Sequence, residues 1–569
     1  EIAEHKEQMK KLPLFKGMYG VELELSKDNV DIVVNPDDSD IFNNTYVVFD
    51  TETTGFNPGL HDSMIEIGAV KLKDGNVIER FDELINPGHH IDEQITNLTG
   101  ISDELVSNCD NEKNVTIRFK EWIGNLPLVA HNAKFDKDML EMAYYKYDLG
   151  ELKNPVIDTW MLSKAINKDC KKHSLTALSK YYKIKFDENV KNDDEEEQVT
   201  GAHHHRADYD AEATGSIFYK MLKQLEKMEN IKTLNDLENI TDEFETNEIV
   251  KEWHVNMISK SKKGLKNLFK LISFANTKYL VKCARIPKHV IEENREDLLI
   301  GSCCMNSEIF LTALSRTEED LKKAMAFYDY IEVQPPSNYE HLVFSHDISN
   351  YDDLIYCLNK IIKCARELGK IVVATSDAHS ITKEDTIYRE FIVNQNVPGK
   401  GRHPLARYLS KEGYNRIPPQ YLRTTDEMLE EFKFLDPEVR EEVVITNTHK
   451  IMDMCEEYEV IEFPDKPYSP EIPDSQKTTT DLVYAKAQSW YGNPLPLNIE
   501  ERIAKELYGD CVYRSCKNII LETETENIEE KTFALVHNKI NEGFDAIKEL
   551  IKNDLKKSDP SLEGAALDK

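Results

Sequence analysis

Short apolar runs separated by turn residues dominate the first part of the chain. Residues 46–49 form an apolar run that breaks at Gly55, and residues 64–72 and 77–84 flank the dipeptide Asp74-Gly75. An Asp-Gly pair between two apolar runs is typical of a β-hairpin. The pattern therefore predicts a three-stranded meander.

Helical periodicity follows this meander. We expect a helix over 114–123, a buried strand over 126–130, and a second helix from Phe135, with Met139 and Met142 at helical spacing. Helix-forming residues also fill 211–228. Strands that alternate with helices are typical of an α/β domain.

A second region of mixed strands and helices begins at His254. Its expected elements are strands at 330–334 and 370–374 and helices at 318–326 and 351–368. Residues 18–25, ahead of the first region, form one more expected strand. From about residue 425 the chain is mostly charged amphipathic helix.

Two polar stretches predict the connections. The acidic residues 187–201 are expected to form a solvated loop, and the charged residues 226–252 are expected to link the two regions. No internal repeat is present in the sequence. The length of 569 residues corresponds to three or four domains at roughly 100 to 200 residues each.

The charge balance restricts the kind of partner. The chain has 71 Lys and Arg against 104 Asp and Glu, a formal net charge of −33. Proteins that hold nucleic acid by bulk electrostatics show the opposite balance. Any contact with DNA must therefore be local or assisted by metal ions.

Targeting signals and cysteine usage point to one compartment. No apolar run approaches the ~20 residues of a membrane helix, and residues 1–11 are too polar for a secretory signal. The ten cysteines include no CxxC pair, so we expect reduced thiols. These features predict a cytoplasmic protein, and a start at Glu1 rather than Met predicts a fragment of a longer one.

Four acidic residues form the candidate chemical site. Asp50 and Glu52 lie two apart on an expected strand, so both carboxylates face one way. Asp136 begins a helix after the strand 126–130, and Asp210 opens another after His205. Carboxylates packed this closely would have raised pKa values, and divalent cations relieve their repulsion. Two such cations are a recurrent device for phosphodiester hydrolysis.

Each of these residues also has a simpler interpretation. A lone Asp-x-Glu at a strand end is usually a solvated turn. The consecutive His203, His204 and His205 could be a surface metal trap, although only His205 stands five positions before Asp210. Two further acids could be mistaken for ligands: we expect Asp158 to be a buried, hydrogen-bonded acid and Asp138 to lie on a helix surface.

Three phrases in order resolve this ambiguity. They are VVFDTETTGFNP, LVAHNAKFDKDML and HRADYDAEATG, and they resemble the three motifs of the DEDDh 3′→5′ exonuclease superfamily of the proofreading type. The resemblance spans roughly residues 44–225 and implies an RNase H-like exonuclease domain, a mixed sheet with flanking helices.

The resemblance also implies a role for each matching residue. Asp50, Glu52, Asp136 and Asp210 would bind two Mg²⁺ or Mn²⁺, and His205 would be the general base. The residues implied to contact the substrate are Thr51, Thr53, Phe56, His131 and Asn132. Gly55 would permit the DTETTG loop to approach the 3′ end closely.

Sequences outside the nuclease resemble a second, larger family. The phrases GLKNLFKLISFANTKYL, DLLIGSCC, YDYIEVQPPSNY and VVATSDAH are similar to the PolC-type DNA polymerase III alpha subunit of Gram-positive bacteria. This resemblance implies that the exonuclease is inserted within a PHP domain, a distorted α/β barrel. The fold class is thus α/β, with an RNase H-like exonuclease inserted in a partial PHP barrel and a mostly helical C-terminal segment.

The resemblance divides the chain into four parts. The expected domains are 1–40, an N-terminal piece of the PHP domain; 41–228, the exonuclease; 229–424, the rest of the PHP domain; and 425–569, a helical segment leading toward a polymerase core that is absent. After residue 430 the sequence offers no closely spaced Asp pairs on strands of the kind a polymerase palm needs.

The PHP resemblance implies a second metal site. Its expected ligands are Glu22, His254, Cys304, Asp377 and His379, and the implied ion is Zn²⁺ or Mn²⁺. The N-terminal motifs that would complete this ligand set are missing, so a structural role is the default expectation. Cys304 could equally be a buried apolar thiol.

The sequence as a whole predicts the exonuclease portion of a PolC-type polymerase. The expected substrate is a DNA 3′ end, single-stranded or frayed, and other replisome subunits are the expected partners in the full-length context, with no membrane partner. Two alternatives stay open at this point. One is an exonuclease that degrades RNA from its 3′ end, and the other is a non-catalytic replisome scaffold.

Overall fold

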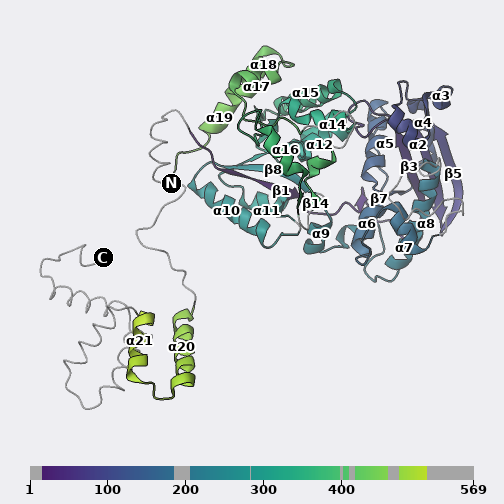
Figure 1. The fold of residues 1–569 in the computed structure, drawn as a ribbon. Coiled ribbons are helices and arrows are strands. Elements are labelled where there is room, and N and C mark those ends of the chain that lie inside the picture. Colours follow the sequence, from purple (N-terminus) through teal and green to yellow (C-terminus); the bar gives the residue numbers. More distant parts are fainter. Residues whose placement is uncertain are drawn as a thin grey trace. The chain divides into compact units, whose positions relative to one another are not determined.

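The computed structural model describes residues 16–184, 206–250, 252–281, 283–397, 401–408, 417–458 and 473–508 (Figure 1). The chain divides into two compact units, residues 1–460 and 461–569. The first unit contains two six-stranded sheets. The described part of the second contains the helices α20 (Ser475–Tyr491) and α21 (Leu497–Tyr508).

The first sheet has the strand order β2-β7-β6-β3-β4-β5. Its strands are β2 (Val33–Val34), β3 (Thr45–Thr53), β4 (Met64–Lys73), β5 (Asn76–Leu84), β6 (Leu128–Ala130) and β7 (Val156–Asp158). β3, β4 and β5 pair antiparallel, which confirms the predicted meander. β6 and β7 continue the sheet in parallel on the other side of β3.

Helices cover both faces of this sheet. They are α2 (Glu93–Thr99), α3 (Asp103–Val106), α4 (Glu112–Ile123), α5 (Lys134–Lys146), α6 (Thr159–Ile166), α7 (Leu175–Tyr182) and α8 (Ala207–Leu225). Alternate residues of β3 enter different cores: Val48 packs with Phe218 of α8, and Phe49 packs with Phe119 of α4. Because successive side chains of a strand point to opposite faces, β3 packs against a helical layer on each side.

The second sheet brings together strands from before and after the first. It has the order β12-β11-β10-β8-β1-β9. Its strands are β1 (Gly20–Ser26), β8 (Glu252–Ser259), β9 (Arg285–Pro287), β10 (Leu298–Gly301), β11 (Tyr330–Val333) and β12 (Ile371–Ala374). β1 pairs antiparallel with β8, and Glu24 stands opposite His254. The whole first sheet is therefore an insertion between two neighbouring strands of the second.

Helices and short strands complete the second sheet's domain. They are α10 (Lys262–Asn276), α11 (Lys288–Asn294), α12 (Glu308–Ser315), α13 (Glu318–Met325), η2 (Pro336–Tyr339), α14 (Glu340–Phe344), α15 (Tyr351–Glu367), α16 (Thr386–Asn394), β13 (Asn396–Val397), β14 (Gly401–Arg402), η3 (Pro404–Arg407), α17 (Thr425–Glu431), α18 (Pro437–Glu441), the π-helical turn η4 (Glu442–Thr446) and α19 (Asn447–Asp453). None of the helices in the described ranges is long and apolar enough to cross a membrane.

The expected linker over 226–252 is a folded segment, so that prediction was wrong. It contains η1 (Asn235–Asn239) and α9 (Glu243–Ile249), whose N-terminus has a capping box. Ile231, Leu234 and Leu237 are buried in the same core as α8. These three apolar residues, spaced three apart, hold an otherwise polar segment against the domain. The acidic loop expected over 187–201 lies outside the described residues.

A glycine on β4 permits helix α8 to approach the sheet. A Cβ atom at Gly68 would stand 2.1 Å from the backbone nitrogen of Asp208 and 2.2 Å from the carbonyl carbon of Ala207. A Cβ at Gly215, further along α8, would meet its nearest neighbour, Val48, at an ordinary 3.5 Å. The first turn of α8 thus lies directly on the backbone of β4.

We predict opposite effects for alanine at these two glycines. Gly68→Ala should destabilise the fold by about 1 to 3 kcal/mol, because the added methyl group forces the first turn of α8 off the sheet. Gly215→Ala should be neutral or stabilising by up to ~1 kcal/mol, because alanine is the better helix former. Thermal unfolding of both variants measures this, and equal stability of the two would contradict the packing.

Candidate active site

The end of β3 presents two carboxylates beside the first turn of α8. Asp50 and Glu52 lie on β3 opposite Gly68 and Glu66 of β4. Both acids are half-buried. Asp136 lies in the first turn of α5, which follows β6, and Asp210 lies in the first turn of α8. One strand end and two helix starts therefore carry the four acids that the sequence pattern singled out.

Asp136 is fixed by β3 itself. Its Oδ1 accepts hydrogen bonds from the backbone N–H of Thr51, at 2.9 Å, and from the Thr51 hydroxyl, at 2.8 Å. Asp136 and Thr51 are both buried. Thr51 stands between Asp50 and Glu52 in the chain. Its hydroxyl, which the resemblance assigned to substrate binding, thus holds the Asp136 carboxylate beside these two acids.

Burial raises the pKa values of all four acids, and neighbouring carboxylates add to it. Burial is the largest cause for Asp50, whose pKa lies well above its usual range, and the charges of Asp136, Asp210 and Glu52 add to it. The pKa of Glu52 rises to about 8, mainly through burial and then through Glu66. Burial raises the pKa of Asp136 to about 7 and that of Asp210 to about 6. The site therefore binds protons when no cation is present.

Glu66 is a site residue that sequence reasoning missed. It is fully buried on β4, and its carboxylate accepts from Arg206 Nε at 2.8 Å and from the Ala207 backbone N–H at 3.1 Å. Arg206 directly precedes α8, so this pair anchors the helix start beside Glu52. The only sequence signal was a single acid within the apolar strand MIEIGAV.

The expected general base cannot be placed. His205, with His203 and His204, lies outside the described residues, and the described chain resumes at Arg206. Because Glu66 holds Arg206, the residue that follows His205 in the chain is anchored at the site.

The loop after β3 carries the other expected substrate contacts. The Thr53 hydroxyl donates to the carbonyl of Gly55 at 2.7 Å. The Phe56 side chain is 56% exposed, and its ring centroid lies 6.1 Å from that of Phe135. A large exposed aromatic beside buried carboxylates is an available stacking surface. A Cβ at Gly55 would stand 2.5 Å from the Asp62 carboxylate, so any other residue there would have to displace that side chain.

His131 and Asn132 lie at the end of β6. His131 Nδ1 is 2.9 Å from the Thr159 hydroxyl, and burial lowers the pKa of His131 to about 4. Asn132 has a left-handed backbone with φ of 61°, and its N–H donates to Asp158 at 3.1 Å. Asp158 also caps α6. It is a buried, hydrogen-bonded acid, as predicted.

Asp138 does not lie on a helix surface, so that prediction was wrong. It is 2% exposed and lies 3.0 Å from Arg316 of the second sheet's domain. The second sheet's domain covers the side of α5 that carries Asp138. The sequence of the helix alone gives no sign of this contact.

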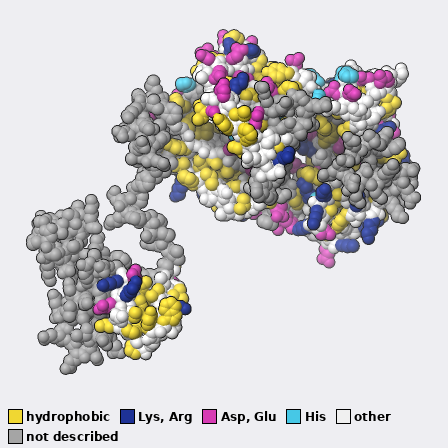
Figure 2. Space-filling model, viewed as in Figure 1, with side chains coloured by type: hydrophobic (Ala, Val, Ile, Leu, Met, Phe, Trp, Pro, Cys, Tyr) yellow, Lys and Arg dark blue, Asp and Glu magenta, His cyan; other side chains and the backbone are white. Residues whose placement is uncertain are grey.

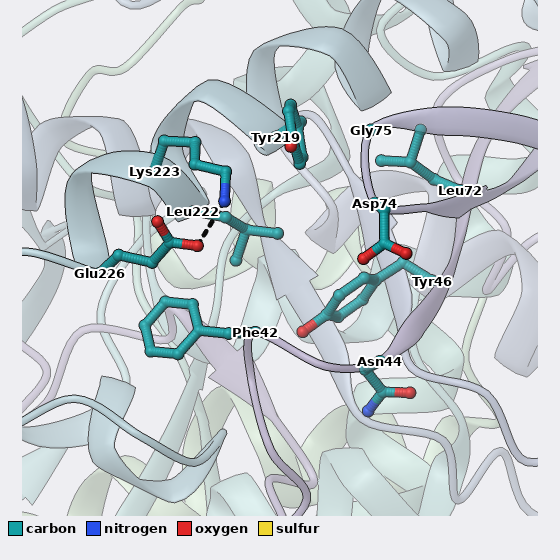
Figure 3. A pocket seen from close by; sticks show the side chains of 10 residues that line it. All are labelled: Phe42, Asn44, Tyr46, Leu72, Asp74, Gly75, Tyr219, Leu222, Lys223 and Glu226. Carbon is teal, nitrogen blue, oxygen red and sulfur yellow. Dashed lines mark hydrogen bonds and ion pairs between the residues drawn. The ribbon is translucent and has the colours of Figure 1, made fainter.

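Two other surface features lie near this domain. A pocket lined by Tyr46, Leu72 and Tyr219 lies at the opposite end of β3 from the carboxylates (Figure 3), so it is not part of the site. On the face shown in Figure 2, basic side chains gather around α6 and α7, where Lys171 and Lys172 are exposed, whereas acidic ones predominate over α17 and α18. Positive charge is thus local in an acidic chain.

A second cluster of ligand-type residues lies on β1, β8 and the loop after β10. One ligand atom each from Glu22, His254, Cys303 and Cys304 falls within 4.8 Å of the others. His254 Nδ1 lies 2.8 Å from Glu22 Oε1 and 3.3 Å from Cys304 Sγ. Among the described residues, the ligand atoms of the four nuclease carboxylates do not all lie this close to one another.

The electrostatics of this cluster favour a bound cation. A hydrogen bond to Cys303 and the charge of His254 lower the pKa of Cys304 to about 6. Burial lowers the pKa of His254, but Cys304 and Glu22 outweigh it and raise that pKa to about 11. A proton on His254 thus balances a thiolate and a carboxylate, a role that a metal ion can take. Thiolate, imidazole and carboxylate are zinc ligands.

The remaining expected ligands lie after β12. Asp377 Oδ1 is 3.2 Å from His379 Nε2, and Asp377 also accepts from Gln420. Neither Asp377 nor His379 belongs to the group of Glu22, His254, Cys303 and Cys304. The negative charge of Asp377 nevertheless acts to raise the pKa of Glu22. Sequence reasoning missed Cys303, whose signal was its neighbour Cys304. It also missed Glu332, a buried acid on β11 whose pKa burial raises to about 7.

Comparisons with known proteins agree with this geometry. Residues 47–218 match a family model described as "Exonuclease". This range contains most of β3, all of α5 and the start of α8, so the four carboxylates lie within the matched residues.

Longer matches identify the larger family. The chain is 38% identical over 510 residues to a protein of Lactococcus lactis named DNA polymerase III PolC-type, a match that covers 86% of this chain and 29% of that protein. The namesake of Staphylococcus haemolyticus is 36% identical over 494 residues, with 86% and 32% covered. The chain thus spans about a third of the length of these relatives. It belongs, over most of its own length, to the PolC-type DNA polymerase III family.

A solved structure with a related title was also found. "Exonuclease X in complex with 5′ overhanging duplex DNA" is 24% identical and covers 35% of this chain and 99% of its own, with a TM-score of 0.26.

We predict that the metal-free chain becomes less stable as pH rises. The pKa of Glu52 is about 8 in the fold against 4.5 ordinarily. The folded form therefore keeps a proton that the unfolded chain loses above pH 4.5, and its stability falls until pH 8. In EDTA, Glu52→Gln should raise Tm at pH 8 by at least about 2 °C, and by less at pH 5. A Gln effect that is equal at both pH values would contradict this.

Proposed function

We propose that residues 41–228 are a 3′→5′ exonuclease that hydrolyses 3′-terminal phosphodiester bonds of DNA, as the proofreading portion of a PolC-type DNA polymerase III. The observation that carries the proposal is the convergence of Asp50, Glu52, Asp136 and Asp210, with Asp136 locked onto Thr51. A group of acids with raised pKa values at one place in the fold is typical of a functional cation site.

The donor set fits two Mg²⁺ or Mn²⁺. Carboxylate oxygens are the ligands that these hard cations prefer. Burial raises the pKa values of Glu52 and Asp136, and a bound cation would favour their ionised forms. When bound, such a pair of ions lowers the pKa of water and stabilises the leaving oxygen. Asp50, Glu52, Asp136 and Asp210 would hold them.

The chain's own residues would bind and orient the 3′ end. Phe56 offers its exposed ring for stacking with a base, and Thr53 shapes the backbone of the loop that carries it. The exposed Lys171 and Lys172 would provide a local contact for phosphates. Single-stranded or frayed ends suit such a site, because stacked duplex bases cannot reach the ring.

The family resemblance supports His205 as the general base. A general base takes a proton from the attacking water, and a neutral imidazole suits that task near pH 7. Glu66 holds Arg206, the residue that follows His205 in the chain. Glu66 would therefore act by positioning.

We also propose that β1, β8 and the strands that follow them form the PHP domain of the family. The boundaries 1–40, 229–424 and 425–569 belong to this proposal. The pairing of β1 with β8 across the inserted nuclease supports it. Glu22, His254 and Cys304, joined by Cys303, would hold Zn²⁺ or Mn²⁺, and Asp377 with His379 would complete the surroundings.

Digestion of a 5′-labelled oligonucleotide tests the nuclease proposal. With Mg²⁺ or Mn²⁺ the chain should shorten single-stranded and mismatched DNA from the 3′ end, and EDTA should stop the reaction. Asp50→Ala and Asp210→Ala should lower the rate by more than about 100-fold, beyond the effect of residues that only support metal ligands. Glu212→Ala is the matched control, because Glu212 is exposed on the same helix and pairs with Arg80.

Three results would contradict the proposal. No shortening with either metal would favour a replisome scaffold, and a clear preference for an RNA oligonucleotide would favour the RNA exonuclease. Equal losses in Asp210→Ala and Glu212→Ala would remove the carboxylates from the chemistry.

Metal content tests the PHP site separately. Zn²⁺ affinity should fall at least about tenfold in Cys304→Ser, because one thiolate ligand is lost. Cys109→Ser, in the nuclease domain, should bind zinc as the unchanged chain does. Zinc binding that is unaffected by Cys304→Ser would overturn the assignment.

A further inference from the structure

The loop that follows the DTETTG sequence is docked on the second sheet's domain. The backbone N–H of Gly59 donates to the carbonyl of Leu314 at 2.8 Å, and Asn57 Nδ2 donates to the carbonyl of Asp347 at 2.5 Å. A Cβ atom at Gly59 would stand 2.7 Å from Leu314 O. The two backbones therefore touch, and the loop tip rests on the end of α12.

A buried lysine holds this contact together. Lys360 of α15 is 5% exposed, and its ammonium donates to the carbonyls of Gly59 at 3.1 Å, Ala313 at 2.8 Å and Arg316 at 2.6 Å. Three carbonyls match the three protons of an ammonium group. Burial lowers its pKa, so removal of a buried cation from water has a cost, and the three hydrogen bonds offset it. One of the three acceptors belongs to the nuclease loop.

A second cation reaches the helix that carries Asp136. Arg316, at the end of α12, pairs with Asp138 at 3.0 Å and with Glu141, both on α5. Asp138 is buried and lies two residues beyond Asp136. Its ion pair with Arg316 therefore fixes the first turns of α5 from outside the nuclease.

These contacts fall on the two elements that shape the site. The same loop carries Phe56, and α5 carries Asp136 and Phe135, whose ring lies 6.1 Å from that of Phe56. The loop is also tied at its base, where the Thr54 N–H donates to Ser63 O at 2.9 Å. Its base is thus held by the nuclease and its tip by the other domain.

We infer that the second sheet's domain is a positioning device for the nuclease. Lys360 and Arg316 are positioning residues: they hold the loop 54–62 and helix α5 so that Phe56 and Asp136 present one fixed surface to the DNA 3′ end. A loop ordered before binding spares the complex the entropy of ordering it. The inference rests on the proposed function, because it assigns the loop to substrate binding.

The test compares three lysine and arginine variants in the full chain. Lys360→Met removes the buried ammonium with little change in length, and Arg316→Met removes the pair with α5. Arg316→Lys keeps a positive charge at that place. Lys363→Met is the matched control, because Lys363 lies on the same helix, exposed, and pairs with Glu318 outside the nuclease.

Two measurements are made on each variant. Hydrogen exchange reports the protection of the amides in residues 54–62, and steady-state digestion of a single-stranded DNA oligonucleotide reports KM and kcat. We expect faster exchange in this loop and a kcat/KM lowered about 10- to 100-fold, mostly through KM, in Lys360→Met and Arg316→Met. Arg316→Lys should recover most of the loss, and Lys363→Met should match the unchanged chain.

Each other outcome overturns the inference. Unchanged loop exchange in both methionine variants would show that the second domain does not hold the loop. Faster exchange with unchanged KM would show that the nuclease does not need the loop held. If Lys360→Met does not fold, Arg316→Met decides in the same way. An unchanged chain without any nuclease activity would refute the proposed function, and the exchange data would distinguish that failure from a failure of docking.

Discussion

Repulsion among partly buried carboxylates is the constraint on which the rest of the nuclease domain depends. Asp50, Glu52, Asp136 and Asp210 favour separation or protonation, and the fold must hold them together without a cation. It does so through backbone geometry. Two acids share one strand, and a third is bonded to the strand residue between them.

The fourth acid is brought in by close packing of α8. Gly68 removes the side chain that would keep the helix away, and Glu66 binds the chain at Arg206 and Ala207 as the helix begins. Glu66 itself adds negative charge next to Glu52. The domain thus anchors its helix at an electrostatic cost, which Arg206 partly offsets.

The insertion explains why the two sheets belong to one unit. The chain leaves the second sheet at β1 and returns at β8, and these strands are paired neighbours. The nuclease is therefore tethered at both ends, and the contacts of Gly59 with Leu314 and of Asp138 with Arg316 add two further points. Two elements that carry site residues, the loop after β3 and α5, are thus contacted from outside the nuclease's own sequence range.

Sequence patterns predicted the parts of this structure that are local. The meander of β3 to β5 and the helices α4, α5 and α8 followed from periodicity. Long-range contacts were not predictable. Asp138 has the pattern of an exposed helical acid and is buried by Arg316, 178 positions away. Lys360 has no local sign that its ammonium meets three carbonyls.

The short strands were missed for a related reason. β7 and β9 have three residues each, too few for a two-residue periodicity to stand out. Segment 226–252 was misjudged because its few apolar residues are spaced among many charges. The segment with His205 lies outside the described residues, so its place at the site stays a prediction.

Anomalous diffraction from crystals of the chain grown with Mn²⁺ and a 3′-terminal nucleotide tests the central claim most directly. The account predicts two manganese peaks among Asp50, Glu52, Asp136 and Asp210. Peaks confined to the cluster of Glu22, His254 and Cys304, with none among the four carboxylates, would contradict it.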